Sequence, residues 1–172
     1  MTQRNLSTAQ AKAYYDRLGS KQDWQFYERR AEERLLALGG FDAASAVFEL
    51  GCGTGALARR LLQDHLPADA RYLGFDLSDT MVALARGRVA SFAPRARIER
   101  SEGGMHFAAG DGSFDRFVSA YVLDLLPPEA IAAALTEAGR LLRPGGLLCL
   151  LSLTAGTSFT SRLVAGTWDR LY

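Results

Sequence analysis

Three glycines stand at alternate positions within residues 51–55, and their placement offers the clearest chemistry in this sequence. They follow a short apolar run over residues 47–50 that carries one acid, Glu49, and they precede a helix-like stretch over residues 56–66. A glycine loop between a buried strand and a helix start lets the backbone approach a ligand closely, with N–H groups pointing at it. The spacing therefore predicts a ligand site at the end of the first strand.

The elements that must position this loop form a repeating pattern of strand-like and helix-like segments. Such alternation predicts an α/β fold, a Rossmann-like, doubly wound and mainly parallel sheet with helices on both faces. The predicted strands cover residues 47–50, 71–76, 96–100, 114–122 and 147–151, and the predicted helices follow Gly55, the cap Ser78 and Pro127-Pro128.

Polar residues after the other strands are further candidates, because ligands of such sheets bind beyond the carboxyl ends of the strands. They are Asp76 after the second strand, Ser101, Glu102 and Gly103 after the third, and Tyr121 and Asp124 after the fourth.

A chain of 172 residues fits a single domain, in which we expect an N-terminal helical lid (1–40), a core (41–155) and a helical tail (156–172). Tyr14 and Asp16 either line that lid over the ligand, together with Tyr15, or pack against the domain.

Charge and composition exclude several classes of function. Twenty Lys and Arg nearly balance 19 Asp and Glu, so no basic field argues for a nucleic-acid partner. No apolar run is long enough for a membrane span, and the start of the chain does not resemble a signal peptide. Cys52 and Cys149 are expected to be reduced thiols of a cytoplasmic protein.

Five motifs, in family order over residues 47–151, resemble those of class I S-adenosylmethionine-dependent methyltransferases, most closely the quinone-biosynthesis-like and other small-molecule types. The motifs are ELGCGTG (49–55), GFDLS (74–78), EG (102–103), GSFD (112–115) and LRPGG (142–146). The resemblance implies an enzyme that binds S-adenosyl-L-methionine, releases S-adenosyl-L-homocysteine and methylates a small molecule.

The resemblance also implies roles for single residues. Asp76 would accept both ribose hydroxyls, and Glu49 would hold the loop and contribute to the ammonium site. Leu77 and Met81 would pack against the adenine, while Glu102 would accept from its amino group. The cofactor-binding set is Glu49, Gly51, Cys52, Gly53, Gly55, Asp76, Leu77, Met81, Glu102, Gly103 and Tyr121.

Some of these roles have structural alternatives. Asp76 could cap the following helix, and Glu102 could be a solvated loop acid, since the family more often has Asp there. The glycines also satisfy a dinucleotide fingerprint, with Asp76 at the spacing of an NAD-binding acid. Against an NAD-binding protein stand the charge of Glu49 near a pyrophosphate, the third glycine and the lack of a hydride-transfer pair.

No residue is assigned a catalytic role. Direct in-line methyl transfer needs mainly positioning, and a general base only if the acceptor must lose a proton. His106 is the one histidine expected near the site, and a lone loop histidine is usually incidental. The sequence shows no metal-ligand spacing.

The family's core continues past its fifth strand through a helix and an antiparallel strand pair, which this chain has too few residues to form. The strand over residues 147–151 would then be an apolar edge, covered by another copy in a homodimer or by the tail. The sequence is also compatible with a fragment of a longer protein. A cofactor-binding protein without catalysis, truncated or regulatory, is therefore the alternative function.

Overall fold

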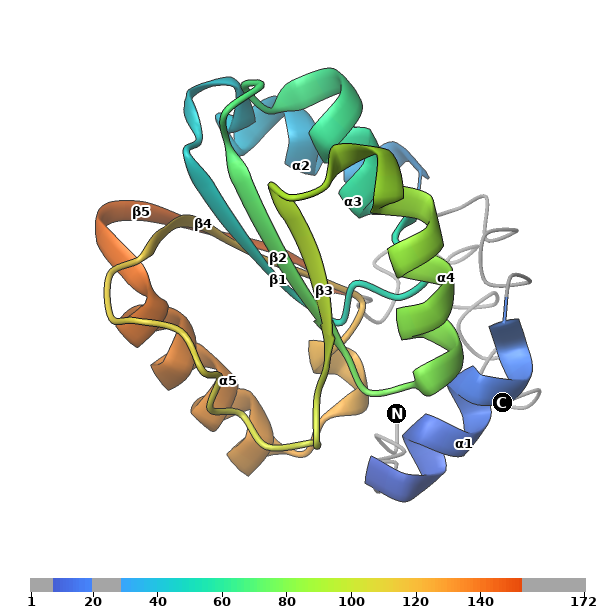
Figure 1. The fold of residues 1–172 in the computed structure, drawn as a ribbon. Helices are drawn as coiled ribbons and strands as arrows, with labels where there is room; N and C mark the ends of the chain where they lie inside the picture. Colours follow the sequence, from blue (N-terminus) through green and yellow to red (C-terminus); the bar gives the residue numbers. More distant parts are fainter. Residues whose placement is uncertain (1–7, 20–28, 153–172) are drawn as a thin grey trace, which may run out of the picture.

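The computed structural model describes residues 8–19 and 29–152, which form a five-stranded sheet with helices on both faces (Figure 1). The strand order is β3-β2-β1-β4-β5 and every neighbouring pair is parallel. The strands are β1 (Ala46–Leu50), β2 (Arg71–Asp76), β3 (Ala96–Arg100), β4 (Phe114–Ala120) and β5 (Leu142–Leu151). The Rossmann-like α/β class is confirmed, and strand order reverses between β1 and β4, beside the predicted glycine loop.

Helices α4 and α5 begin where the local start signals predicted. The Ser78 hydroxyl accepts the Met81 N–H at 3.1 Å and caps α4, while α5 starts at Pro128. The helices are α1 (Thr8–Leu18), α2 (Arg29–Leu38), α3 (Ala56–Arg60) with its π-helical continuation η3 (Leu61–His65), α4 (Asp79–Val89) and α5 (Pro128–Leu141), and the 3-10 turns are η2 (Phe41–Ala43), η4 (Ala90–Phe92) and η5 (Leu123–Leu125).

Each face of the sheet has its own apolar core. On one face Val47 and Tyr72 pack with Leu61 and Val82, under α2, α3 and α4. On the other face α5 covers a group of aromatic rings, with the Phe48 centroid 5.0 Å from that of Phe117. Alternating side chains of the buried strands thus fill both cores and hold the strand ends in place.

Two predicted boundaries at the β4–β5 side are wrong. The strand expected to reach Val122 ends at Ala120, because Tyr121 takes a positive φ of 58° that breaks the extended chain. The fifth strand, predicted over residues 147–151, begins at Leu142, and residues 143–146 form an irregularity inside β5.

The described residues include only part of the predicted lid and none of the predicted tail. Helices α1 and α2 occupy the predicted N-terminal region. The predicted tail over residues 156–172 lies outside the described residues. Among the helices of the described ranges, none combines the length and apolar character needed to cross a membrane.

Candidate cofactor site

The loop after β1 folds through left-handed glycines, and its N–H groups bond within the protein. Gly51, Gly53 and Gly55 have φ of 74°, 52° and 77°. The Gly51 and Cys52 N–H groups both donate to the Phe75 carbonyl, at 2.8 and 3.0 Å, and Gly55 N–H donates to the Cys52 carbonyl at 2.9 Å. These three N–H groups are therefore engaged within the protein, and what the loop offers a ligand is close backbone approach. That N–H groups of the loop point at a ligand stays a prediction.

Two of the glycines are also required by packing. A Cβ on Gly51 would lie 2.2 Å from Val122 Cγ2, in the segment after β4. A Cβ on Gly55 would lie 2.8 Å from Ala85 Cα, in α4. The loop is therefore pressed between β4 and α4, which fixes its position beyond the strand ends.

Asp76, the last residue of β2, joins the glycine loop to α4. Its Oδ2 accepts the Gly53 N–H at 2.9 Å and its Oδ1 accepts the Ser78 N–H at 2.9 Å. Burial raises the pKa of Asp76, opposed by these backbone hydrogen bonds. The predicted alternative, a cap of the following helix, is met by Ser78, whose N–H Asp76 accepts, and the carboxylate keeps acceptor capacity for a ligand hydroxyl.

Glu49 lies inside the sheet, where the Tyr72 hydroxyl donates to its Oε2. Gly74 makes room for this contact, because a Cβ there would lie 2.9 Å from the Tyr72 hydroxyl oxygen. Burial raises the pKa of Glu49 to about 8, although the Tyr72 bond opposes the shift. Glu49 is consequently protonated for the most part at pH 7. The predicted repulsion between a negative Glu49 and a pyrophosphate therefore does not apply.

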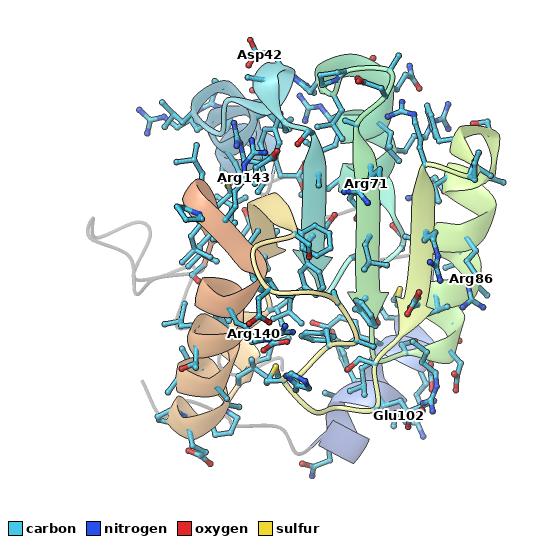
Figure 2. All side chains as sticks on the ribbon, turned by 60° about the vertical axis from the view of Figure 1, so that its left-hand side comes forward. Asp42, Arg71, Arg86, Glu102, Arg140 and Arg143 are labelled. Carbon is cyan, nitrogen blue, oxygen red and sulfur yellow. The ribbon has the colours of Figure 1, made fainter. Side chains whose placement is uncertain are left out.

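The residues predicted for the adenine lie in unequal surroundings. Leu77 is half-buried and Met81 is fully buried beneath the start of α4. The side chain of Glu102 is 82% exposed, pairs with Arg100 and lies beyond the end of β3 (Figure 2). The Gly103 N–H donates to Ser101 Oγ at 3.1 Å. The structure therefore brings Asp76 and the glycine loop together and leaves Glu102 on the rim.

Cys52 and Tyr121, two further members of the predicted set, are held by hydrogen bonds of their backbone N–H groups. Cys52 is buried and its thiol is free, and burial raises its pKa well above the ordinary value. The Tyr121 N–H donates to the Leu151 carbonyl at 2.9 Å, at the tips of β4 and β5. Cys149 is likewise a buried free thiol.

Sequence reasoning missed the clamp that holds residues 105–111 over the sheet. Glu137 accepts the Phe107 N–H at 2.8 Å and two bonds from Arg140, at 2.6 and 2.9 Å. The Arg140 bonds lower the pKa of Glu137 to about 2. His106 Nδ1 lies 3.2 Å from Glu137 Oε2, so His106 belongs to this clamp. The i,i+3 spacing between Glu137 and Arg140 was the only signal in the sequence that could have singled out Glu137.

A parallel sheet with a glycine loop after β1 and a carboxylate at the end of β2 defines a Rossmann-like domain that binds a nucleoside cofactor. Within the described residues, no three His, Cys, Asp or Glu side chains gather as metal ligands. The comparison with known families then names the group. The family described as "Methyltransferase domain" matches residues 47–146, so the chain belongs to that family, whose cofactor is S-adenosyl-L-methionine.

Curated relatives agree with this assignment. The chain is 38% identical over 109 residues to a carboxy-S-adenosyl-L-methionine synthase of Chromohalobacter salexigens, covering 60% of this chain and 38% of that protein. It is 31% identical over 150 residues to a malonyl-[acyl-carrier protein] O-methyltransferase of Serratia marcescens, covering 87% and 54%. The chain thus spans about half of these relatives or less.

Solved structures share the fold. The [4+2]-cyclase SpnF superposes with a TM-score of 0.70 at 21% identity, covering 84% of this chain and 59% of that one. A SAM-dependent methyltransferase from Aquifex aeolicus superposes with a TM-score of 0.62 at 19% identity, covering 74% and 66%. The resemblance to class I methyltransferases is therefore confirmed at the levels of family and fold.

Proposed function

We propose that this protein is an S-adenosylmethionine-dependent methyltransferase that acts on a small-molecule acceptor by direct in-line transfer. The observation that carries the proposal is the Asp76 carboxylate, bonded at once to the glycine loop and to the start of α4. This arrangement leaves acceptor capacity on a half-buried acid, which suits two neighbouring ribose hydroxyls.

The site residues divide by the part of the cofactor they would hold. The loop from Gly51 to Gly55 would lie along the methionyl part, and Glu49 beneath it would contribute to the ammonium site. Leu77 and Met81 would pack on the adenine, for which fully buried Met81 must gain access through a shift of neighbouring side chains. Glu102 and Gly103 would face the adenine edge, and Tyr121 would contribute to the site from the end of β4.

The cofactor supplies a methyl group on a cationic sulfur, which leaves as a neutral thioether when the acceptor attacks. What the chain must supply is position, because an aligned nucleophile and methyl need little else. Among the described residues His106 is engaged with Glu137, so no general base is assigned. The balanced charge supports a small molecule over a nucleic acid as acceptor, and the free cysteines support a cytoplasmic location.

Thermal unfolding with S-adenosylmethionine, S-adenosylhomocysteine or NAD tests this proposal. A ligand at a hundred times its dissociation constant should add about 2.7 kcal/mol of stability. Asp76→Ala should remove most of the gain with the two sulfur nucleosides. Asp42→Ala, an exposed acid near the opposite end of the sheet (Figure 2), should keep it. Stabilisation by NAD alone would reject the proposal in favour of a dinucleotide-binding protein.

Cofactor binding without catalysis is the second candidate function. Proteins of this fold differ in their chemistry, since the structural relatives include a [4+2]-cyclase. Turnover of labelled S-adenosylmethionine against a panel of metabolites separates the two candidates. Stabilisation by cofactor with no transfer to any acceptor, and none after addition of cell extract, would favour the binding protein.

The protein is also proposed to form a homodimer through β5. An apolar groove lies between α2 and this edge strand, lined by Leu35, Leu38 and residues 147–151. Leu38 is 81% exposed and Leu147 and Leu148 are each 42% exposed. An open apolar strand edge tends to pair with another chain, and a second copy would offer the same edge in return.

A further inference from the structure

Helix α1 is anchored on the start of α4 by one acid and one base. Asp16 Oδ1 accepts the Ser78 hydroxyl at 2.5 Å and lies 3.4 Å from the Thr80 nitrogen. Lys12 Nζ lies 2.8 Å from Asp16 Oδ2 and 2.7 Å from Asp79 Oδ2. Although 62 residues separate Asp16 from Ser78 in the chain, Asp16 thus completes the cap of α4 from another helix.

Ser78 is the joint between this anchor and the cofactor site. Its side chain is buried, donates to Asp16 and accepts the Met81 N–H at 3.1 Å. Its backbone N–H donates to Asp76 Oδ1, and Oδ2 of the same carboxylate accepts the Gly53 N–H. A continuous line of hydrogen bonds therefore runs from α1 through the first turn of α4 to the glycine loop.

From this line we infer that Asp16 is a positioning residue, which holds the Asp76 carboxylate in the orientation that receives the ribose hydroxyls. The inference rests on the proposed function and deepens it. The Ser78 hydroxyl both donates and accepts a hydrogen bond, which fixes the side chain in one rotamer. The position of the Ser78 backbone N–H, which orients Asp76, is thereby fixed as well. Loss of Asp16 would leave a buried hydroxyl without its acceptor, and the first turn of α4 would shift to recover one.

Lys12 serves as the matched comparison, because it touches the same acid on the oxygen that faces away from Ser78. It contacts the Oδ2 atoms of Asp16 and Asp79, with side chains that are 31%, 30% and 63% exposed. Such partly exposed ion pairs contribute little. The pKa of Asp16 is lowered to about 2, first by Lys12 and then by Ser78, so Asp16 is an anion throughout any ordinary assay.

The test compares dissociation constants, measured by calorimetry on the full chain, for S-adenosylhomocysteine and its 2′,3′-dideoxy analogue. Asp16→Ala should weaken S-adenosylhomocysteine on the order of tenfold, because the acceptor that fixes the Ser78 hydroxyl is lost. The same variant should change the dideoxy analogue less than about twofold, since that ligand has no hydroxyls for Asp76. Lys12→Ala should leave both constants within about twofold, and Asp16→Asn, which keeps an acceptor oxygen for Ser78, should restore most of the affinity.

The outcomes separate the inference from the proposed function. Equal weakening of both ligands by Asp16→Ala, or no weakening of either, overturns the positioning role and leaves the proposed function standing. Failure of the unmodified protein to bind S-adenosylhomocysteine overturns the proposed function itself. Melting of each variant without ligand confirms that α1, in which alanine is a favourable residue, still folds.

Discussion

Glu49 shows how a single residue inside the sheet responds to its surroundings. It is 2% exposed, and the only hydrogen bond described for its carboxyl group comes from the Tyr72 hydroxyl. Burial therefore raises the pKa of Glu49 to about 8 in the folded protein, against 4.5 for the ordinary side chain. An acid that is neutral at pH 7 is able to donate as well as accept, which suits a position beneath a backbone loop.

Glu49→Gln should stabilise the protein increasingly as the pH rises from 5 to 8. Between the ordinary pKa and the raised pKa the folded state binds more protons than the unfolded state, so the stability of the unmodified protein falls as pH rises through this window. Glutamine mimics the protonated acid and removes that dependence, with a gain on the order of 1 kcal/mol or more at pH 8. Urea unfolding at each pH gives the difference.

The control for this prediction is Glu129→Gln, an exposed acid at the start of α5, which should show no trend over the same range. If the stability difference for Glu49→Gln is constant from pH 5 to 8, the prediction is wrong. The two side chains would then differ in packing and not in protonation.

At the scale of elements, the glycine loop depends on the close approach of α3 and α4. Gly55→Ala should destabilise the fold by about 1–3 kcal/mol, because a left-handed φ of 77° and a contact of 2.8 Å with the backbone of Ala85 both oppose a side chain. It should also weaken the cofactor, since the loop must move. Urea unfolding and ligand titration measure the two effects.

Gly87→Ala in α4 is the matched control for this substitution. Its Cβ would meet nothing within 4 Å, and alanine is the better helix former, so this change should stabilise the protein by up to about 1 kcal/mol. A Gly55→Ala variant as stable as Gly87→Ala would contradict the packing described for the loop.

Sequence reasoning reached those elements whose signals are local. The cap Ser78, the helix-starting Pro128 and the apolar run of β1 each act on neighbouring residues, so their consequences were predictable. The end of β4 was not, because the left-handed Tyr121 is fixed by its bond to Leu151 in another strand. The irregularity in β5 likewise depends on the register with β4.

The same division holds within the candidate site. Asp76 and the glycines were found from their order along the chain. The contact of Asp16 with Ser78 and the bond from Tyr72 to Glu49 were not found, because they join side chains that only the finished fold brings together.

At the scale of the whole molecule, the sheet is protected unequally at its two edges. β3, at one edge, carries Arg97, Glu99 and Arg100, which discourage pairing with another chain. β5, at the other, presents Leu147 and Leu148 beside the apolar groove under α2. The difference in charge between the two edges places the expected association at β5.

Leu147→Glu should shift the protein from dimer to monomer, because a charge at the centre of an apolar interface loses its hydration on association. Sedimentation velocity over a range of concentrations measures the shift. Leu135→Glu on α5 is the control, since Leu135 is also 42% exposed but lies on the opposite face of the sheet. A single monomeric species for the unmodified protein at high concentration would contradict the dimer.

The bonds of Arg116 bear on the order in which parts of the fold can form. Its guanidinium in β4 donates to the carbonyls of Gly39 and Gly40, at 2.6 and 2.5 Å, and so finishes the end of α2. On a ribosome those two carbonyls emerge first and must stay hydrated while some seventy-six further residues are added. The two bonds from Arg116 that finish the end of α2 can therefore form only after β4 has been synthesised and has docked against β1.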